Sequence, residues 1–453
     1  MIDVKKENRF ILGILIPIIL ENVLLTLSSL VITGYVGRLL IMEISAQGVA
    51  NRLYGIYFSI FKGLAIGLMV LAARHYGSGR LDRCRIVQAR AMTMILPLAL
   101  LSSILLFMFR FDFFRLITQD VQILHLASRY FQIAVLGFPF VAITALNTAA
   151  FQAQGNTRRP LYIAALGNLF NITVGYGLIF GTAYTPAFGL SGAAMSLVSS
   201  QVLSAGMGLW GLYGKRFGLF KDTVKVSLLT MFDRFENGRI LATGVPAALE
   251  NTFWQFATLI ISRVIIAYGT AHYAAYQMGL QAEGLSEMLS VGFVTASISL
   301  ASIAIGKQDD ALFKFYFKRL TQMSVLISTS TMILLFFFAE QLMGLLTDKA
   351  ELIQIGTLYL KIMAGSQLPQ NMSKVLNGFI RSSGYKIVPM LVSFTGLWLV
   401  RVPLSLLAQS VFGWDILTIW WIINLDQWVR FSISLTVFLK AKIHDVIRLQ
   451  TST

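Results

Sequence analysis

Charged residues are scarce in this sequence. Asp, Glu, Lys and Arg make up 13% of its 453 residues, whereas hydrophobic residues make up 56% and the mean hydropathy is +0.71. A soluble domain carries about a quarter charged residues, so this composition indicates a protein embedded in a lipid bilayer. Only helices or closed barrels satisfy the backbone in lipid. Continuous apolar runs such as 94–109 and 324–339 favour helices, since barrel strands alternate apolar and polar residues.

Cysteine and histidine are also rare. The single cysteine, Cys84, excludes an internal disulfide or a thiolate metal cluster, and the four histidines are scattered along the chain. The sequence has no P-loop, HExxH or GxSxG motif. A membrane-embedded lipid-modifying enzyme would need a His/Asp or Ser/His set at one membrane depth, and we find none. We therefore expect no enzymatic activity, no catalytic residue, no metal site and no cofactor.

Acidic residues are fewer than basic ones, 21 against 37, which gives a formal net charge of +16. In a soluble protein this excess of basic residues would suggest nucleic-acid binding. In a membrane protein, Lys and Arg concentrate in the loops on the cytoplasmic side, which accounts for the same excess. The basic residues gather in alternate connections, for example at Arg80, Arg83 and Arg85 and again at Arg158 and Arg159. This pattern predicts a multi-pass protein of the cytoplasmic (inner) membrane with both termini in the cytoplasm, and no nucleic-acid partner.

Apolar segments long enough to cross a bilayer core of about 30 Å recur along the whole chain. They fall near residues 9–36, 45–73, 88–109, 121–152, 160–183, 188–214, 239–267, 272–302, 316–339, 351–382, 388–413 and 415–440. The fold class we expect is an all-α integral membrane protein with twelve transmembrane helices.

The two halves of the chain repeat each other at one constant offset. Pro17, Glu21 and Asn22 fall on Pro246, Glu250 and Asn251, and several glycines match at the same offset, such as Gly63 on Gly292. Matches of Pro, Gly, Glu and Asn are informative in an apolar protein, where Leu and Ile matches are not. Because each half has an even number of spans, the repeats are parallel and related by an axis along the membrane normal.

This repeat defines the domains that we expect. They are an N-terminal six-helix lobe (1–213), a cytoplasmic linker (214–238) and a C-terminal six-helix lobe (239–453). Residues 214–225 are basic with apolar positions interspersed, which predicts a helix lying on the inner leaflet.

At several motifs the chain resembles the multidrug and toxic compound extrusion (MATE) family. The motifs are Pro17-xxx-Glu21-Asn22, Gly155-Asn-Thr-Arg-Arg-Pro160 followed by Gly167-Asn168-xx-Asn171, Gly244-Val-Pro246, Ala274-Ala275-x-Gln277, Gly396-Leu-Trp398-Leu-Val-Arg401-Val-Pro403 and Leu425-Asp426-x-Trp428-x-Arg430. The resemblance implies a two-lobed antiporter that exports small organic, often cationic or amphiphilic compounds in exchange for H+ or Na+ by alternating access. It also implies a small-molecule substrate and a monomer in the bilayer.

The acids that couple transport to ions in that family are replaced here. The matching positions hold Ile32 in the first span, Gly175 in the fifth, Trp254 in the seventh and Gln370 in the tenth, although Asn171 is kept. The resemblance therefore leaves the coupling ion and its stoichiometry open. A flippase of the same superfamily, moving a lipid-linked oligosaccharide or glycolipid, is the alternative. Its cationic cleft would be lined by Lys62, Arg263, Lys361 and Lys374.

Ionisable residues inside spans are costly and mark functional sites by default. Glu283 and Glu287 share one helix face, which is suited to binding a proton or cation, or else they pair with Arg263, Lys361 or Lys374. Glu250 lies one turn before Trp254, so Glu250 and its repeat mate Glu21 are further ion-coupling candidates. The alternative is that these two glutamates each stabilise a helix start.

Residues in the spans that we expect to face the cleft are the candidates for substrate binding. Aromatic rings attract organic cations, and polar groups among them would fix orientation. Lys62, in the middle of the second span, either pairs with Glu283 or Glu287 across the cleft or snorkels. Asp426 and Arg430, four residues apart on one helix face, are expected to pair with each other. The cleft candidates are Trp254, Tyr276, Gln277, Phe58, Lys62, Asn171 and Gln370.

Overall fold

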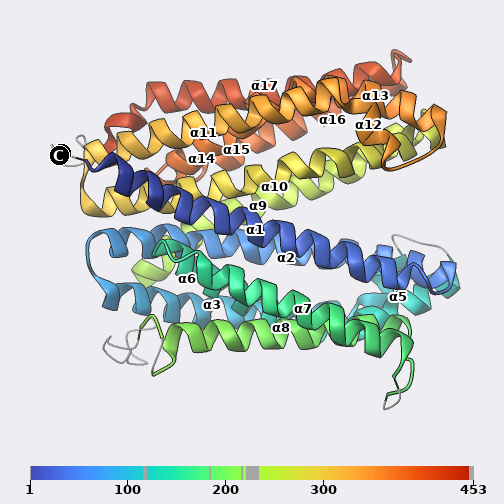
Figure 1. Cartoon of the computed structure of the whole chain (residues 1–453), viewed down its shortest axis with the longest axis horizontal. Coiled ribbons are helices and arrows are strands. Elements are labelled where there is room, and N and C mark those ends of the chain that lie inside the picture. The colour runs from blue at the N-terminus through green and yellow to red at the C-terminus, as the bar shows by residue number, and fades with distance from the viewer. Residues whose placement is uncertain (1, 116–119, 183–184, 216–217, 221–233, 448–453) are drawn as a thin grey trace. The chain divides into compact units, whose positions relative to one another are not determined.

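The computed structural model describes residues 2–115, 120–182, 185–215, 218–220 and 234–447, and these form twelve long helical segments (Figure 1). Those of the first half are α1 (Val4–Val36), α2 (Ile41–Gly77), α3 (Leu81–Met108), α5 (Val121–Ala134) continued through η1 (Val135–Gly137) into α6 (Phe138–Ala153), α7 (Arg158–Phe180) and α8 (Leu190–Tyr213).

The second half repeats this order. Its segments are α9 (Arg234–Ile266), α10 (Thr270–Lys307), α11 (Asp310–Phe337), α13 (Ala350–Ala364) followed by α14 (Gln367–Ser382), α15 (Val388–Phe394) continued through η3 (Thr395–Arg401) into α16 (Val402–Ser410), and α17 (Ile416–Lys440). Short helices α4 (Arg110–Arg115), α12 (Ala339–Gly344) and η4 (Ile443–Asp445) lie between or after them. The predicted twelve-helix fold is confirmed.

Hydropathy separates these segments into two kinds. Eight helices in the described part of the chain are long and apolar enough to cross a membrane by composition alone. The four other segments, such as α9 with Glu250 and α17 with Asp426, carry more charged or small polar residues. Charges in lipid are tolerated where they face protein, so the less apolar segments are the ones expected to carry polar interactions.

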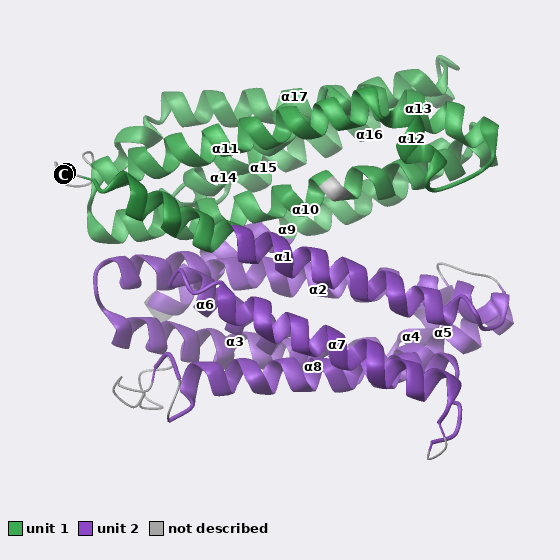
Figure 2. Ribbon diagram, viewed as in Figure 1, with its two compact units in different colours: residues 1–15, 249–453 green, residues 16–248 purple. Residues whose placement is uncertain are grey.

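The helices pack into two compact units (Figure 2). One contains residues 16–248, and the other contains residues 1–15 together with 249–453. The chain passes between units inside α1, just before Pro17, and inside α9, just after Pro246. The repeat boundary at residue 239 stays a prediction. Most of the predicted linker helix, at 216–217 and 221–225, lies outside the described residues.

Small residues explain why the first part of α9 belongs to the unit of residues 16–248. A Cβ added to Gly63 of α2 would lie 2.4 Å from the Cα of Ala248, and one added to Gly67 would lie 2.2 Å from the carbonyl oxygen of Ile240. On the α9 side, a Cβ on Gly244 would lie 2.7 Å from the carbonyl oxygen of Leu64. Glycines at such crossings allow helix backbones to approach closely in a membrane.

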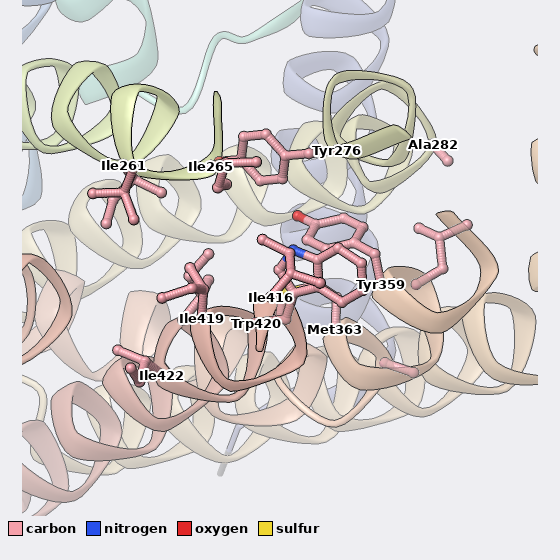
Figure 3. Close-up of a cluster of buried hydrophobic side chains, with 14 of the residues drawn as sticks. Ile261, Ile265, Tyr276, Ala282, Tyr359, Met363, Ile416, Ile419, Trp420 and Ile422 are labelled. Carbon is pink, nitrogen blue, oxygen red and sulfur yellow. The ribbon is translucent and has the colours of Figure 1, made fainter. Parts of the chain in front are cut away.

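The core of the other unit consists mostly of aliphatic side chains, with three buried aromatic rings packed among them (Figure 3). Tyr276 of α10 packs edge-on against Tyr359 of α13 with ring centroids 5.4 Å apart, and Tyr359 packs in the same way on Trp420 of α17 at 5.5 Å. All three side chains are buried. Tyr276, a predicted cleft residue, is therefore part of the packed core of this unit.

A π-helical turn, η3, interrupts the penultimate segment of this unit. A Cβ on Gly396 within this turn would lie 2.2 Å from Oδ1 of Asp426 and 2.4 Å from Cγ of Arg430, so a larger residue here would force these side chains to shift. The corresponding segment of the first repeat, α7, is an uninterrupted α-helix. Since π turns concentrate at functional sites, this difference directs attention to the charges around Asp426.

Candidate ion-coupling and substrate site

The two acids predicted to share a face of α10 have different partners. Glu287 accepts hydrogen bonds from Nζ of Lys374, which lies 2.7 Å from both carboxylate oxygens, and from Nε2 of Gln370, also at 2.7 Å. Glu283 accepts a hydrogen bond of 2.9 Å from the hydroxyl of Tyr359. The sequence predicted that these acids either bind a proton or cation or pair with a nearby basic residue. In the structure, Glu287 pairs with Lys374.

A ladder of small polar side chains fixes α14 against α10. Ser286 donates to Gln367, and Ser290 donates to Asn371, one turn further along both helices. Asn371 in turn donates to Ser328 of α11 at 2.9 Å. Buried polar groups must be paired, so this ladder sets the register of the two helices. It brings the face of α14 that carries Gln370 and Lys374 to Glu287.

Asp426 forms a second charged cluster in the same unit. Its side chain is fully buried, and Oδ2 lies 2.7 Å from Arg401 of η3 and 2.9 Å from Arg430 on its own helix. The predicted Asp426–Arg430 pair is confirmed, with Arg401 as an additional partner. Arg401 and Lys374 also lie within electrostatic range of Glu283, which links the two clusters.

Glu250 lies well inside α9, more than four turns after its first residue, and pairs with Arg381 of α14. Its other carboxylate oxygen accepts a hydrogen bond of 3.2 Å from Ser393 of α15. Glu21 is likewise internal to α1. The alternative in which these two glutamates stabilise helix starts is wrong, because both are embedded in the middle of long helices.

Glu21 has its own partners in the unit of residues 16–248. Nε2 of Gln152 in α6 lies 3.5 Å from its carboxylate. Lys62 of α2 lies within electrostatic range of the same carboxylate, and its ammonium lies 5.8 Å from the ring centre of Phe58. Glu21, Lys62 and Phe58, which were predicted separately as ion and substrate residues, are therefore neighbours.

The positions that carry acids elsewhere in the family are apolar or neutral here. A Cβ on Gly175 would lie 2.9 Å from Cδ1 of Ile32, so these two residues of α7 and α1 face each other and hold no carboxylate. Asn171, one turn before Gly175, is buried. Trp254 exposes 45% of its surface, and Gln277 is half-buried on α10.

Sequence reasoning named the acids but missed two of their partners. Tyr359 was not among the candidate residues, and Arg401 appeared only as a motif residue between Gly396 and Pro403. The signal that could have identified Arg401 is its charge inside an otherwise apolar span, since such a charge needs a partner.

Comparison with known proteins decides the family. The MatE family model matches residues 17–177 and again residues 246–407. The chain belongs to the MatE family. The two matches begin at Pro17 and Pro246, the two prolines that the repeat places on each other.

Relatives in the MatE family align with nearly the whole length of this chain. The probable multidrug resistance protein NorM of Thermotoga maritima is 24% identical over 97% of this chain and 94% of its own length. The probable multidrug resistance protein YoeA of Bacillus subtilis is 23% identical over 90% of this chain and 88% of its own.

Solved MATE structures share the fold. An outward-facing multidrug resistance MATE transporter of the MOP superfamily has a TM-score of 0.87 at 18% identity, over 97% of this chain and 96% of its own. A MOP superfamily transporter from Pyrococcus furiosus, described as having a binding pocket of reverse polarity, has a TM-score of 0.87 at 17% identity and the same coverage. This MatE protein is therefore a multi-pass membrane transporter with the twelve-helix, two-lobe MATE architecture.

Proposed function

We propose that this MatE protein is a secondary antiporter that exports small organic, cationic or amphiphilic compounds in exchange for H+ or Na+ by alternating access. The multidrug resistance names of its relatives support drug export. The observation that carries the coupling part is the pair of carboxylates on α10, Glu283 and Glu287, which face a tyrosine and a lysine inside the membrane segments. A carboxylate inside a membrane segment costs free energy, so it is expected either to bind an ion or to pair with a cationic residue.

Glu283 and Glu287 take the role that acids on the seventh and tenth spans have elsewhere in the family. Trp254 and Gln370 cannot carry a charge, whereas Glu287 lies within hydrogen-bond distance of Gln370 itself. The half-exposed ring of Trp254 supplies a surface on which a flat organic cation can stack. The coupling acid has thus moved from α14 to the facing helix, α10.

The proposal includes an inner-membrane location with both termini in the cytoplasm, which the distribution of basic loops supports. It also includes a monomer as the transporting unit and H+ or Na+ as the transported ion, with no resident cofactor.

A lipid-linked flippase is the weaker alternative. Its cationic cleft would need Lys374, but this lysine is bound to a carboxylate at 2.7 Å. Lys361, another of the cations invoked for that cleft, is exposed on α13. NorM of Thermotoga maritima and YoeA of Bacillus subtilis are named as probable multidrug resistance proteins, which favours drug export.

Gradient-driven transport tests the proposal. The full chain is reconstituted in proteoliposomes, and export of ethidium is followed after a pH jump and, separately, a Na+ jump. We expect Glu283→Gln and Glu287→Gln each to lower gradient-driven export at least about tenfold, since neither amide can exchange a proton or hold a cation. Glu351→Gln, an exposed acid in the first turn of α13, is the matched control and should transport like wild type. Wild-type export by both glutamine variants of α10 would refute the proposal.

A further inference from the structure

The ion pair of Glu287 differs from the other membrane ion pairs of its unit in being open. Glu287 exposes 44% of its side chain and Lys374 exposes 23%. Asp426 is fully buried between two arginines, and in the pair of Glu250 with Arg381 the side chains expose 24% and 5%. An arginine fork in a closed pair fixes geometry, whereas the lysine stem is flexible and its ammonium is a compact point charge. The Glu287–Lys374 pair is therefore more exposed and less rigidly held than these two pairs.

The lysine occupies the place that a bound cation would take. Its ammonium lies 2.7 Å from both carboxylate oxygens of Glu287, and Gln370 completes the contacts of that carboxylate. A carboxylate left alone in a low-dielectric site is strongly destabilised, so Lys374 leaves readily only when another cation or a proton neutralises Glu287. In its present position the ammonium is already within electrostatic range of a second acid, Glu283.

The pair has no counterpart in the other repeat. At the offset that places Pro17 on Pro246, Glu287 corresponds to Phe58 and Lys374 to Ala145. The shared scaffold therefore does not require a lysine at this position, and packing in the first repeat is achieved by apolar and aromatic residues. A charge pair found in one repeat alone is more readily explained by a role at the site than by the fold.

We propose that Lys374 is a tethered competitor for the cation site on Glu287. An organic ammonium or phosphonium substrate, or the coupling H+ or Na+, binds this carboxylate only by displacing the lysine. This inference rests on the proposed function in that both use the same carboxylate. The groups that face Glu287 are Lys374 and Gln370 on α14 and Glu283 one turn earlier on α10. Tyr359 on α13 and Arg401 in η3 act on the neighbouring Glu283.

Competition makes a quantitative prediction. If the lysine occupies the carboxylate about nine-tenths of the time, it lowers the apparent affinity for an external cation about tenfold. Removing the ammonium should therefore tighten binding of a cation, although it removes a polar contact. A lysine with a purely structural role would leave the affinity unchanged or reduced when removed.

The test is equilibrium binding of tetraphenylphosphonium to the purified full-length protein in nanodiscs at pH 7.5, which requires no transport. We expect Lys374→Met to bind it about tenfold more tightly than wild type, Lys374→Arg to bind like wild type or more weakly, and the Lys374→Met/Glu287→Gln double variant to lose the gain. Lys361→Met removes the same charge from an exposed site of the same unit and should bind like wild type. Lys374→Gln replaces Lys374→Met should the latter fail to fold, with the same expectation.

The outcomes separate this inference from the proposed function. Tighter binding by Lys374→Met that depends on Glu287 supports the competitor role, whether or not wild type shows gradient-driven export. Equal or weaker binding by Lys374→Met, binding by neither protein, or a gain that persists without Glu287 overturns it. Export that depends on Glu287 without any gain on lysine removal would uphold the proposed function and refute only the competitor role.

Discussion

Arg381 pairs with Glu250 at the position where Gln152 meets Glu21 in the other repeat. Both pairs join residues 131 positions apart, from the first helix of a repeat to its fourth span. The scaffold and the glutamate are kept, but the partner is a guanidinium in one repeat and an amide in the other. In the first repeat Lys62 of α2 supplies the positive charge instead. Each glutamate is thus neutralised within its own unit by a different residue.

This relationship predicts that Glu250 acts in stability and not in coupling. Arg381→Gln leaves a partly buried carboxylate without its cation, so we expect it to lower the free energy of unfolding by about 2–4 kcal/mol. The Glu250→Gln/Arg381→Gln double variant, which forms a neutral amide pair, should recover most of that loss. Thermal unfolding in detergent measures both. A double variant no more stable than Arg381→Gln would contradict the pairing.

The close approach at Gly396 predicts a steric effect. Gly396→Ala forces a methyl group toward Oδ1 of Asp426, which two arginines hold in place, so we expect a loss of about 1–3 kcal/mol. The control is Gly206→Ala in α8, where an added Cβ meets nothing within 4 Å. That substitution should be neutral or stabilise by up to about 1 kcal/mol through helix propensity. Equal melting temperatures for the two variants would show that the contact with Asp426 is not tight.

The first residues of α1 and α9, the two helices that pass from one unit to the other, predict a third effect on stability. Glu236, at the start of α9, pairs with Arg90 of α3, while Glu7, at the start of α1, accepts a hydrogen bond of 2.6 Å from Tyr316 of α11. Glu236 is the repeat mate of Glu7. In each repeat, the first helix thus carries a glutamate that contacts the third span of the unit in which that helix begins.

Because the pair with Arg90 is ionic and buried on the arginine side, Glu236→Gln should destabilise more than Tyr316→Phe, which removes one hydrogen bond worth about 1 kcal/mol. Melting temperatures of the two variants in the same detergent provide the measurement. A larger loss for Tyr316→Phe would contradict the assignment of Glu236 as the stronger contact.

The sequence was sufficient for the fold and for the candidate acids. Long continuous apolar runs can cross a lipid bilayer only as helices. Matches of Pro, Gly, Glu and Asn at one constant offset identify the repeat. The pair of Asp426 with Arg430 could be predicted from their spacing on one helix, and Lys374 was one of three cations named for the acids of α10. Most partners on other helices could not be predicted, because they depend on how each helix is rotated and at what depth it lies. Glu250 and Arg381 are an example, since no local spacing links them. The crossing of α1 and α9 between units was also missed, because the order of helices in a repeat does not specify their packing.

The central claim is that Glu283 and Glu287 couple substrate movement to an ion. The most direct measurement is ion flux driven by substrate alone. Proteoliposomes loaded with the full chain receive an outward tetraphenylphosphonium gradient, and entry of H+ and of 22Na+ is recorded together. The account predicts entry of one of the two ions in wild type and in Glu351→Gln, and its loss in Glu283→Gln/Glu287→Gln at an unchanged level of folded protein. Substrate-driven ion entry that persists in this double variant would contradict it.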